Sequence, residues 1–266
     1  MELRIILLAI DVRNSSITVA MADVKRNSAE IIFDHVFSSS RCTTVDECVM
    51  NFHQIESLYS LDHKYIDSVA LCSVDPVMTD VFVSASRKYF GVQPFVVKPG
   101  IKSLLKIKID NPAELGSDIL VNSVAAARSG ALPAIVIDIG MAVTVSAINE
   151  KSEIIGSIIS PGVDMSAKAL NAYAPQIPLT NTVNSAGVLG TNTSDSLYSG
   201  LIRGMAYSIN GFVNAIKVDY FAKDKLKVYV KNACSDDIFR YFDFEYESTP
   251  HLTVNGLIEL YKINNI

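Results

Sequence analysis

The feature that most constrains the fold is a strand–aspartate–turn–strand unit that occurs twice. In Ala134–Ile148 an apolar run leads to Asp138, Gly140 follows where a tight turn can use its backbone freedom, and a second apolar run returns. Ile5–Ala20 has the same design around Asp11. Burial of an unpaired carboxylate is unfavourable, so each aspartate indicates either a functional group or a cap of its own turn. Two such units about half a chain apart predict two similar half-domains that face each other, each offering a carboxylate to one cleft.

Alternating strands and helices are predicted for the rest of the chain, which indicates an α/β fold with helices covering a sheet. Thr43 or Thr44 would cap a helix over Thr44–Leu58, and Pro76 suits the first position of a helix that ends near Tyr89. We expect a first half-domain over residues 1–115 and a second over 116–266. The other expected strands are Glu30–Phe37, Ile66–Ser73, Pro94–Lys98, Glu153–Ser160 and Lys225–Val230, and the other helices are Ile119–Arg128, Asp164–Tyr173, Ser194–Ile216 and Leu252–Asn264.

Composition excludes several classes of protein. The net charge is −5 and no dense Lys/Arg run occurs, which argues against nucleic-acid binding. No segment has the ~20 apolar residues of a membrane helix, and the N-terminal apolar run is too short for a signal peptide. We therefore expect a cytoplasmic protein with no membrane contact.

Cysteine and histidine positions point to no metal site. The cysteines have neither paired metal-ligand spacing nor a disulfide-rich pattern, so reduced thiols are expected at Cys42, Cys48, Cys72 and Cys234. His53 and His63 have no nearby acidic partner in the sequence, so a metal site there is not expected.

A third candidate segment runs from Asn111 to Asp118 and leads into the Ile119–Arg128 helix. Asp118 falls near the first turn of that helix, where backbone N–H groups and the helix dipole favour a carboxylate. That Ser117 or Asp118 merely caps the helix remains an open alternative at this point.

Five segments together resemble the motifs of the type III pantothenate kinases, and they follow one another in that family's order over nearly the whole chain. This family is a branch of the acetate and sugar kinase/Hsp70/actin superfamily, whose members contain two ribonuclease-H-like half-domains. The segments are Asp11-Val-Arg-Asn14-Ser15, Asn111-Pro-Ala-Glu-Leu-Gly116-Ser-Asp118-Ile-Leu-Val-Asn122, Asp138-Ile-Gly140-Met-Ala142-Val-Thr144, Gly156-Ser-Ile-Ile-Ser-Pro161-Gly162, and Gly190-Thr-Asn192-Thr193 with Ser199-Gly200.

The resemblance implies ATP-dependent phosphorylation of pantothenate to 4'-phosphopantothenate, the first step of coenzyme A synthesis. It implies that Asp118 accepts the proton of the attacking hydroxyl and that Asp11 and Asp138 hold Mg²⁺. It further implies a homodimer that uses a monovalent cation (K⁺ or NH₄⁺), with Thr193 reaching the substrate pocket of the partner. The implied ATP and phosphate contacts are Asp11, Val12, Arg13, Asn14, Ser15, Ser16, Gly140, Met141, Ala142 and Thr144, and the implied substrate contacts are Gly116, Ser117, Asp118, Ile119 and Thr193.

Several positions depart from the family pattern. Arg13 replaces a glycine, Ile119 replaces an arginine near the pantothenate carboxylate, and Met141 replaces a hydroxyl residue. Lys231-Asn232-Ala233 stands in place of Thr-Gly-Gly, so adenosine is expected to fit poorly.

These departures leave alternatives open. One is a weakened kinase, another a non-catalytic member that binds a ligand or regulates a partner, and a third a kinase for a neutral substrate. A Rossmann dehydrogenase and a serine hydrolase are disfavoured, since neither Gly-x-Gly-x-x-Gly after a strand nor Gly-x-Ser-x-Gly occurs.

Overall fold

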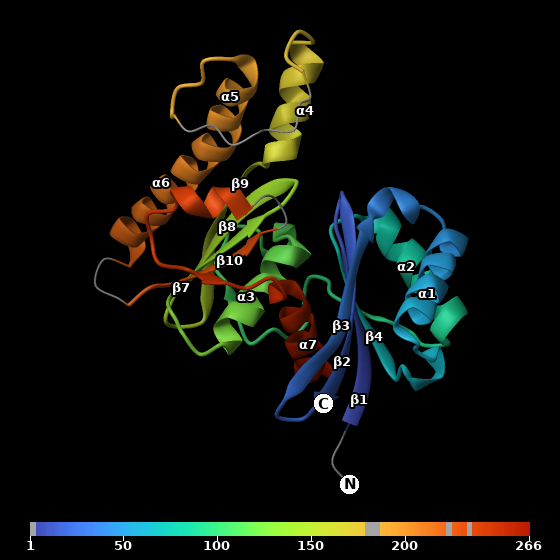
Figure 1. Ribbon diagram of the computed structural model, residues 1–266. Coiled ribbons are helices and arrows are strands. Elements are labelled where there is room, and N and C mark those ends of the chain that lie inside the picture. Colours follow the sequence, from blue (N-terminus) through green and yellow to red (C-terminus); the bar gives the residue numbers. More distant parts are fainter. Residues whose placement is uncertain (1–3, 179–186, 222–224, 233–235) are drawn as a thin grey trace. The chain divides into compact units, whose positions relative to one another are not determined.

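The chain forms two compact α/β units, each built around one sheet. The structure is a computed structural model that describes residues 4–178, 187–221, 225–232 and 236–266 (Figure 1). One unit comprises Met1–Ser129 together with His251–Ile266, and the other comprises Gly130–Pro250.

In the first unit, five strands form a sheet in the order β3-β2-β1-β4-β5. The first three strands form an antiparallel meander, and β4 and β5 add to β1 in parallel. The predicted hairpin is confirmed and is longer than expected. The strands are β1 (Arg4–Val12), β2 (Ser16–Lys25), β3 (Ala29–Ser38), β4 (Ser68–Ser73) and β5 (Phe95–Val96), and a two-residue strand β6 (Lys106–Ile107) follows.

Helices cover both faces of this sheet (Figure 1). The pair α1 (Val45–Tyr59) and α2 (Pro76–Phe90) lies on one face, and α3 (Ser117–Arg128) and α7 (Leu252–Asn265) pack against each other on the opposite face. Short 3-10 turns complete the unit at η1 (Ser39–Arg41), η2 (His63–Tyr65) and η3 (Pro112–Glu114).

The helix starts follow from their capping residues. Thr44 accepts a hydrogen bond from the backbone of Glu47, whose carboxylate bonds back to Thr44, and this capping box begins α1. Asp75 caps α2, with Pro76 at the first helical position as predicted.

The sheet of the second unit repeats the strand order of the first. Within this unit the strands follow as β9-β8-β7-β10-β11, again an antiparallel meander extended by parallel strands. The predicted internal duplication is therefore confirmed at the level of topology. The strands are β7 (Ala134–Ile139), β8 (Ala142–Ile148), β9 (Glu153–Pro161), β10 (Lys227–Asn232) and β11 (Glu247–Ser248).

A long helical run covers the second sheet. It begins as α5 (Thr193–Tyr198), passes through a π-helical stretch η4 (Ser199–Arg203), and continues as α6 (Gly204–Tyr220), whose apolar side chains pack on those of β7 and β8. The single helix predicted over Ser194–Ile216 is thus longer and contains a π-helical interruption. The remaining helical segments are α4 (Val163–Tyr173) and the 3-10 stretch η5 (Asp236–Tyr241).

Gly200 and Gly204, four positions apart in this helical run, have no second backbone packed tightly against them within the described residues. Among the described residues, a Cβ on Gly200 would meet no atom within 4 Å, and one on Gly204 would make only ordinary contact. Both glycines instead line a groove of about 340 Å³ together with Ser160 and Ser166.

The boundary between the units differs from the predicted division after residue 115. The first unit extends to Ser129 and takes the C-terminal helix as well. The physical reason is packing, because α3 contacts β4 and α7 packs along α3 and contacts β1 and β4. Sequence order alone would have assigned both helices to the second half.

The expectation of reduced thiols is wrong for two cysteines. Cys42 and Cys48 form a disulfide, since the turn into α1 brings their Cα atoms to 5.0 Å. Cys72 is a free, buried thiol. Cys234 lies outside the described residues.

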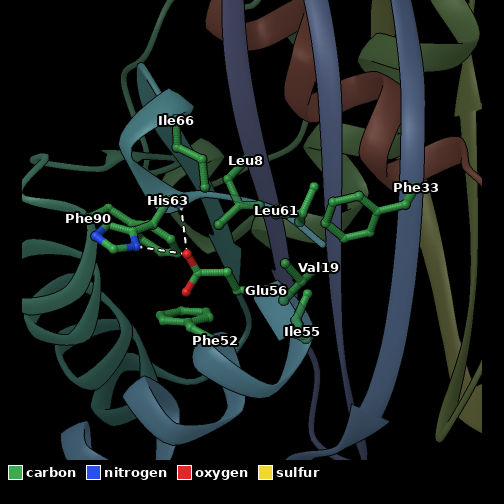
Figure 2. Close-up of a pocket in the computed structure, with 10 residues that line it drawn as sticks. All are labelled: Leu8, Val19, Phe33, Phe52, Ile55, Glu56, Leu61, His63, Ile66 and Phe90. Atoms are coloured by element: carbon green, nitrogen blue, oxygen red, sulfur yellow. Dashed lines mark hydrogen bonds and ion pairs between the residues drawn. The ribbon is translucent and has the colours of Figure 1, made fainter. Parts of the chain in front are cut away.

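Glu56 is the acidic partner of His63 that sequence inspection missed. Its Oε1 accepts hydrogen bonds from the backbone N and Nδ1 of His63 at 2.9 and 2.8 Å (Figure 2). Tyr89 donates its hydroxyl to Oε2. Burial alone would raise the pKa of Glu56, but the hydrogen bonds from Tyr89 and His63 outweigh it and lower the pKa to about 2. This network borders a small pocket of about 20 Å³, whose other lining residues are Leu8, Val19, Phe33, Phe52, Ile55, Leu61, Ile66 and Phe90.

Over the part of the chain that the structure describes, no helix has the length and apolar character needed to cross a membrane.

Candidate active site

Strand alternation decides where the side chain of Asp11 lies. Leu8, Ile10 and Val12 belong to the apolar cluster beneath α1 and α2. Because successive side chains of a strand point to opposite faces, Asp11 lies on the other face, the one that α3 and α7 cover. Asp11 is only 1% exposed, so this carboxylate requires polar partners.

Arg13 supplies one of those partners and connects three elements of the first unit. Its Nε donates to Asp11 Oδ1 at 2.7 Å, its Nη1 donates to Asp118 Oδ2 at 3.1 Å, and its Nη2 donates to Thr253 Oγ1 at 3.2 Å. Thr253 in turn donates to Asn122 Oδ1 at 2.7 Å. We call Asp11, Arg13, Asp118 and Thr253 the arginine cluster.

Asp118 stands in the first turn of α3 and does not cap the helix. The N-cap residue is Gly116, which has no side chain to accept a hydrogen bond. A Cβ on Gly116 would lie 2.5 Å from Asp118 Oδ1, so glycine there leaves room for the carboxylate. Ser117 donates its hydroxyl to the Ser73 carbonyl at 2.7 Å and ties the helix start to the end of β4.

Cys72 lies beside Asp11 in the parallel pair of β1 and β4 and has no nucleophilic character. Burial, reinforced by the negative charge of Asp11, raises the pKa of Cys72 to about 12. The protonated thiol points to Ser117 Oγ at 3.5 Å.

The remaining residues of the first hairpin divide into core and surface. Val12 is buried in the core, so only its backbone could meet a ligand. Asn14 and Ser15 are exposed and Ser16 is half-buried. The turn is closed by a hydrogen bond from Arg13 N to the Ser16 carbonyl at 2.9 Å, which leaves the side chains of Asn14 and Ser15 at the turn accessible to solvent.

In the second unit, Asp138 repeats the position of Asp11. Each aspartate is the next-to-last residue of its strand, and each is paired across the hairpin with a threonine, Thr18 or Thr144. Asp138 is 6% exposed, and Gly140, Met141, Ala142 and Thr144 are each half-buried around the turn.

Gly162 holds this second turn in place by close backbone contact. Its N donates to the Met141 carbonyl at 2.7 Å. A Cβ on Gly162 would lie 2.0 Å from the carbonyl oxygen of Gly140, so any side chain would displace the turn.

Lys231 approaches Asp138 from the neighbouring strand. The two residues are register partners in the parallel pair of β10 and β7, and Lys231 Nζ lies 3.9 Å from Asp138 Oδ2. Ala233, which was expected to crowd adenosine together with Lys231, lies outside the described residues.

Two further candidate residues lie in contrasting environments. Ile119 is 5% exposed and belongs to the interior of the first unit, so its side chain does not reach solvent. Thr193 is exposed at the start of α5, directly after the N-cap residue Asn192.

Sequence reasoning missed Thr253 and the contact of Lys231 with Asp138. Nothing in the sequence around Thr253 marks it as part of a site. The contact of Lys231 with Asp138 could have been found only by placing β10 beside β7 in register.

Comparison with solved structures supports the predicted fold. A Baf family protein from Campylobacter jejuni superimposes with a TM-score of 0.56 at 18% identity, over 97% of this chain and 98% of that one. The ethanolamine utilization protein EutJ from Carboxydothermus hydrogenoformans gives 0.52 at 13% identity, over 97% and 89%. The predicted fold class, an α/β fold with two similar half-domains, is confirmed.

Sequence comparison gives the family. The type III pantothenate kinase model matches residues 7–215. The type III pantothenate kinase of Halalkalibacterium halodurans is 33% identical over 258 residues, which is 97% of this chain and 99% of the relative. That of Thermobifida fusca is 34% identical over 210 residues, 78% and 80% of the two chains. The chain belongs to the type III pantothenate kinase family.

Proposed function

We propose that this protein phosphorylates pantothenate with ATP and forms 4'-phosphopantothenate. It is a kinase by family, and the family implies ATP and a divalent metal. The observation that carries the proposal is that Asp118 stands in the first turn of α3, with its carboxylate bonded into the cluster that contains the hairpin aspartate Asp11.

In the proposed reaction, Asp118 accepts the proton of the pantothenate hydroxyl that attacks the terminal phosphate of ATP. A positioned base of this kind typically contributes about 10²–10⁴-fold to the rate. Gly116 and Ser117 would shape the substrate side of this helix start.

The two hairpin turns would contact phosphate. In the first, the exposed Asn14 and Ser15 offer hydrogen-bond donors, with Ser16 beside them. In the second, Gly140, Met141 and Ala142 offer backbone groups and Thr144 a hydroxyl. Phosphoryl transfer depends mainly on positioning and neutralisation of charge, which such donors supply.

Asp11 and Asp138 remain our proposed ligands of the divalent metal, since carboxylate oxygens are what Mg²⁺ prefers. Neither carboxylate fits a metal without change, because each has a cationic neighbour of its own. The Oδ1 of Asp11 accepts the Arg13 guanidinium, and Lys231 Nζ lies 3.9 Å from Asp138 Oδ2.

We also propose a homodimer, with Thr193 at the partner's substrate pocket, and a requirement for K⁺ or NH₄⁺. The groove beside Gly200 and Gly204 is open, and Tyr207 on the same helical run is 49% exposed, which suits contact with a second copy. A monomer in light scattering at micromolar concentration would remove the dimer and the role of Thr193. The cytoplasm is the proposed location.

The test is an ATP- and Mg²⁺-dependent assay that compares pantothenate with pantetheine, which lacks the carboxylate. We expect phosphorylation of pantothenate. Turnover of pantetheine alone would indicate a kinase for a neutral substrate, in keeping with the buried Ile119. Turnover of neither compound, by protein shown to be folded, would overturn the proposal.

A further inference from the structure

The guanidinium of Arg13 binds the carboxylate of Asp11, which a metal ion would need as a ligand. Asp11 is buried, and its Oδ1 accepts the Arg13 Nε at 2.7 Å, a short distance for a bond between charged groups. A divalent ion bound to that oxygen would have to displace the guanidinium.

Arg13 is held in this place by more than Asp11. Its planar guanidinium donates from a different nitrogen to each of Asp11, Asp118 and Thr253, an arrangement that lysine could not reproduce. The hydrogen bond that Thr253 donates to Asn122 fixes the Thr253 hydroxyl, which is the third acceptor for Arg13. The side chain is 19% exposed, so water competes weakly for these bonds.

We propose that Arg13 competes with divalent metal ions for Asp11 and so sets a low metal affinity at the first hairpin. The inference rests on the proposed function only in taking Asp11 as a metal ligand. Arg13 is a positioning residue here, because it acts on the carboxylates of Asp11 and Asp118.

The expected size of the effect follows from the bond that the metal must replace. Losing a hydrogen bond between charged groups changes an equilibrium constant by about ten- to hundred-fold, and here that constant is the metal-binding constant of Asp11. Without Arg13, Asp11 and Asp118 lose the cation they share. A divalent ion would then neutralise both carboxylates in place of the guanidinium, and no guanidinium would compete with it for Asp11.

The experiment measures Mn²⁺ binding to the full chain by electron paramagnetic resonance, without nucleotide or pantothenate. We expect Arg13→Gln to bind Mn²⁺ about ten- to hundred-fold more tightly than the wild type. Adding Asp11→Asn to Arg13→Gln should abolish the gain. The matched control is Arg4→Gln, which removes another arginine–aspartate pair of the same sheet (Arg4 Nε to Asp23 Oδ2, 2.9 Å) and should leave Mn²⁺ binding unchanged.

Unchanged or weaker Mn²⁺ binding by folded Arg13→Gln would overturn the inference. If Arg13→Gln does not fold, Arg13→Lys takes its place, since it keeps one charge but loses the fork. It should bind Mn²⁺ with an affinity above the wild type, and an affinity equal to the wild type would also overturn the inference. Because no turnover is measured, the result is independent of whether pantothenate is the substrate.

Discussion

Replacing Glu56 by glutamine tests the hydrogen-bond network at the end of α1. The carboxylate accepts two hydrogen bonds from His63 (Figure 2) and one from Tyr89, and together they bring its pKa to about 2 from an ordinary 4.5. At about 1.4 kcal/mol per unit, this shift corresponds to a ceiling of about 3.5 kcal/mol. Glutamine keeps the shape and one acceptor oxygen, so we expect Glu56→Gln to lose about 1.5–3 kcal/mol at pH 7.

The pH dependence of this loss has a definite sign. Because folding lowers the pKa of Glu56, its ionisation stabilises the fold above pH 4.5, and the contribution is lost as the pH falls toward 2. The difference between wild type and Glu56→Gln should therefore shrink by roughly 1 kcal/mol between pH 7 and pH 3.5.

Urea unfolding followed by far-UV circular dichroism at the two pH values measures this difference, since the chain has no tryptophan to report by fluorescence. The matched control is Asp46→Asn on the same helix, whose carboxylate is 79% exposed in its pair with Lys88 and should contribute less than about 1 kcal/mol. Equal stability of Glu56→Gln and wild type at pH 7, or a difference that does not change with pH, would refute the reasoning.

Three further predictions concern the candidate site. Gly162→Ala should destabilise the second unit by about 1–3 kcal/mol and reduce turnover, because its Cβ would lie 2.0 Å from the Gly140 carbonyl oxygen. Gly156→Ala on the preceding strand β9 meets nothing within 4 Å and is the control in thermal unfolding and activity assays. Ile119→Arg should lower the unfolding free energy by several kcal/mol, since Ile119 is buried, and a variant as stable as wild type in urea would show that the position opens to solvent. ATP should bind weakly without a divalent metal because Lys231 and its neighbours add side chains where the family has bare backbone, and calorimetry that shows tight metal-free binding would contradict this.

Local patterns in the sequence predicted the frame of the site. Apolar runs ending in Asp11 and Asp138 predicted both hairpins. Within each strand, the face of the sheet to which a side chain points follows from its position in the run. Thr44 and Pro76 predicted the helix starts because capping involves only neighbouring residues. Such features depend on interactions within a few positions of the chain.

Features that depend on distant residues could not be predicted. Arg13 meets Asp118 and Thr253, which lie 105 and 240 positions away, and α7 joins the first unit although it follows the last strand of the second. The disulfide of Cys42 with Cys48 depends on the path of the turn before α1, which a spacing of 6 residues does not specify.

The central claim is that Asp118 is the base of a pantothenate kinase. The most direct measurement is the rate at which the wild type and Asp118→Asn form 4'-phosphopantothenate from ATP and pantothenate. The unfolding free energy of both proteins is measured alongside. The account predicts turnover by the wild type and a rate about 10²–10⁴-fold lower for Asp118→Asn. Any loss of stability should be limited to the weakened bond from Arg13, because asparagine keeps an acceptor oxygen and Asp118 caps no helix. Full turnover by Asp118→Asn would contradict it.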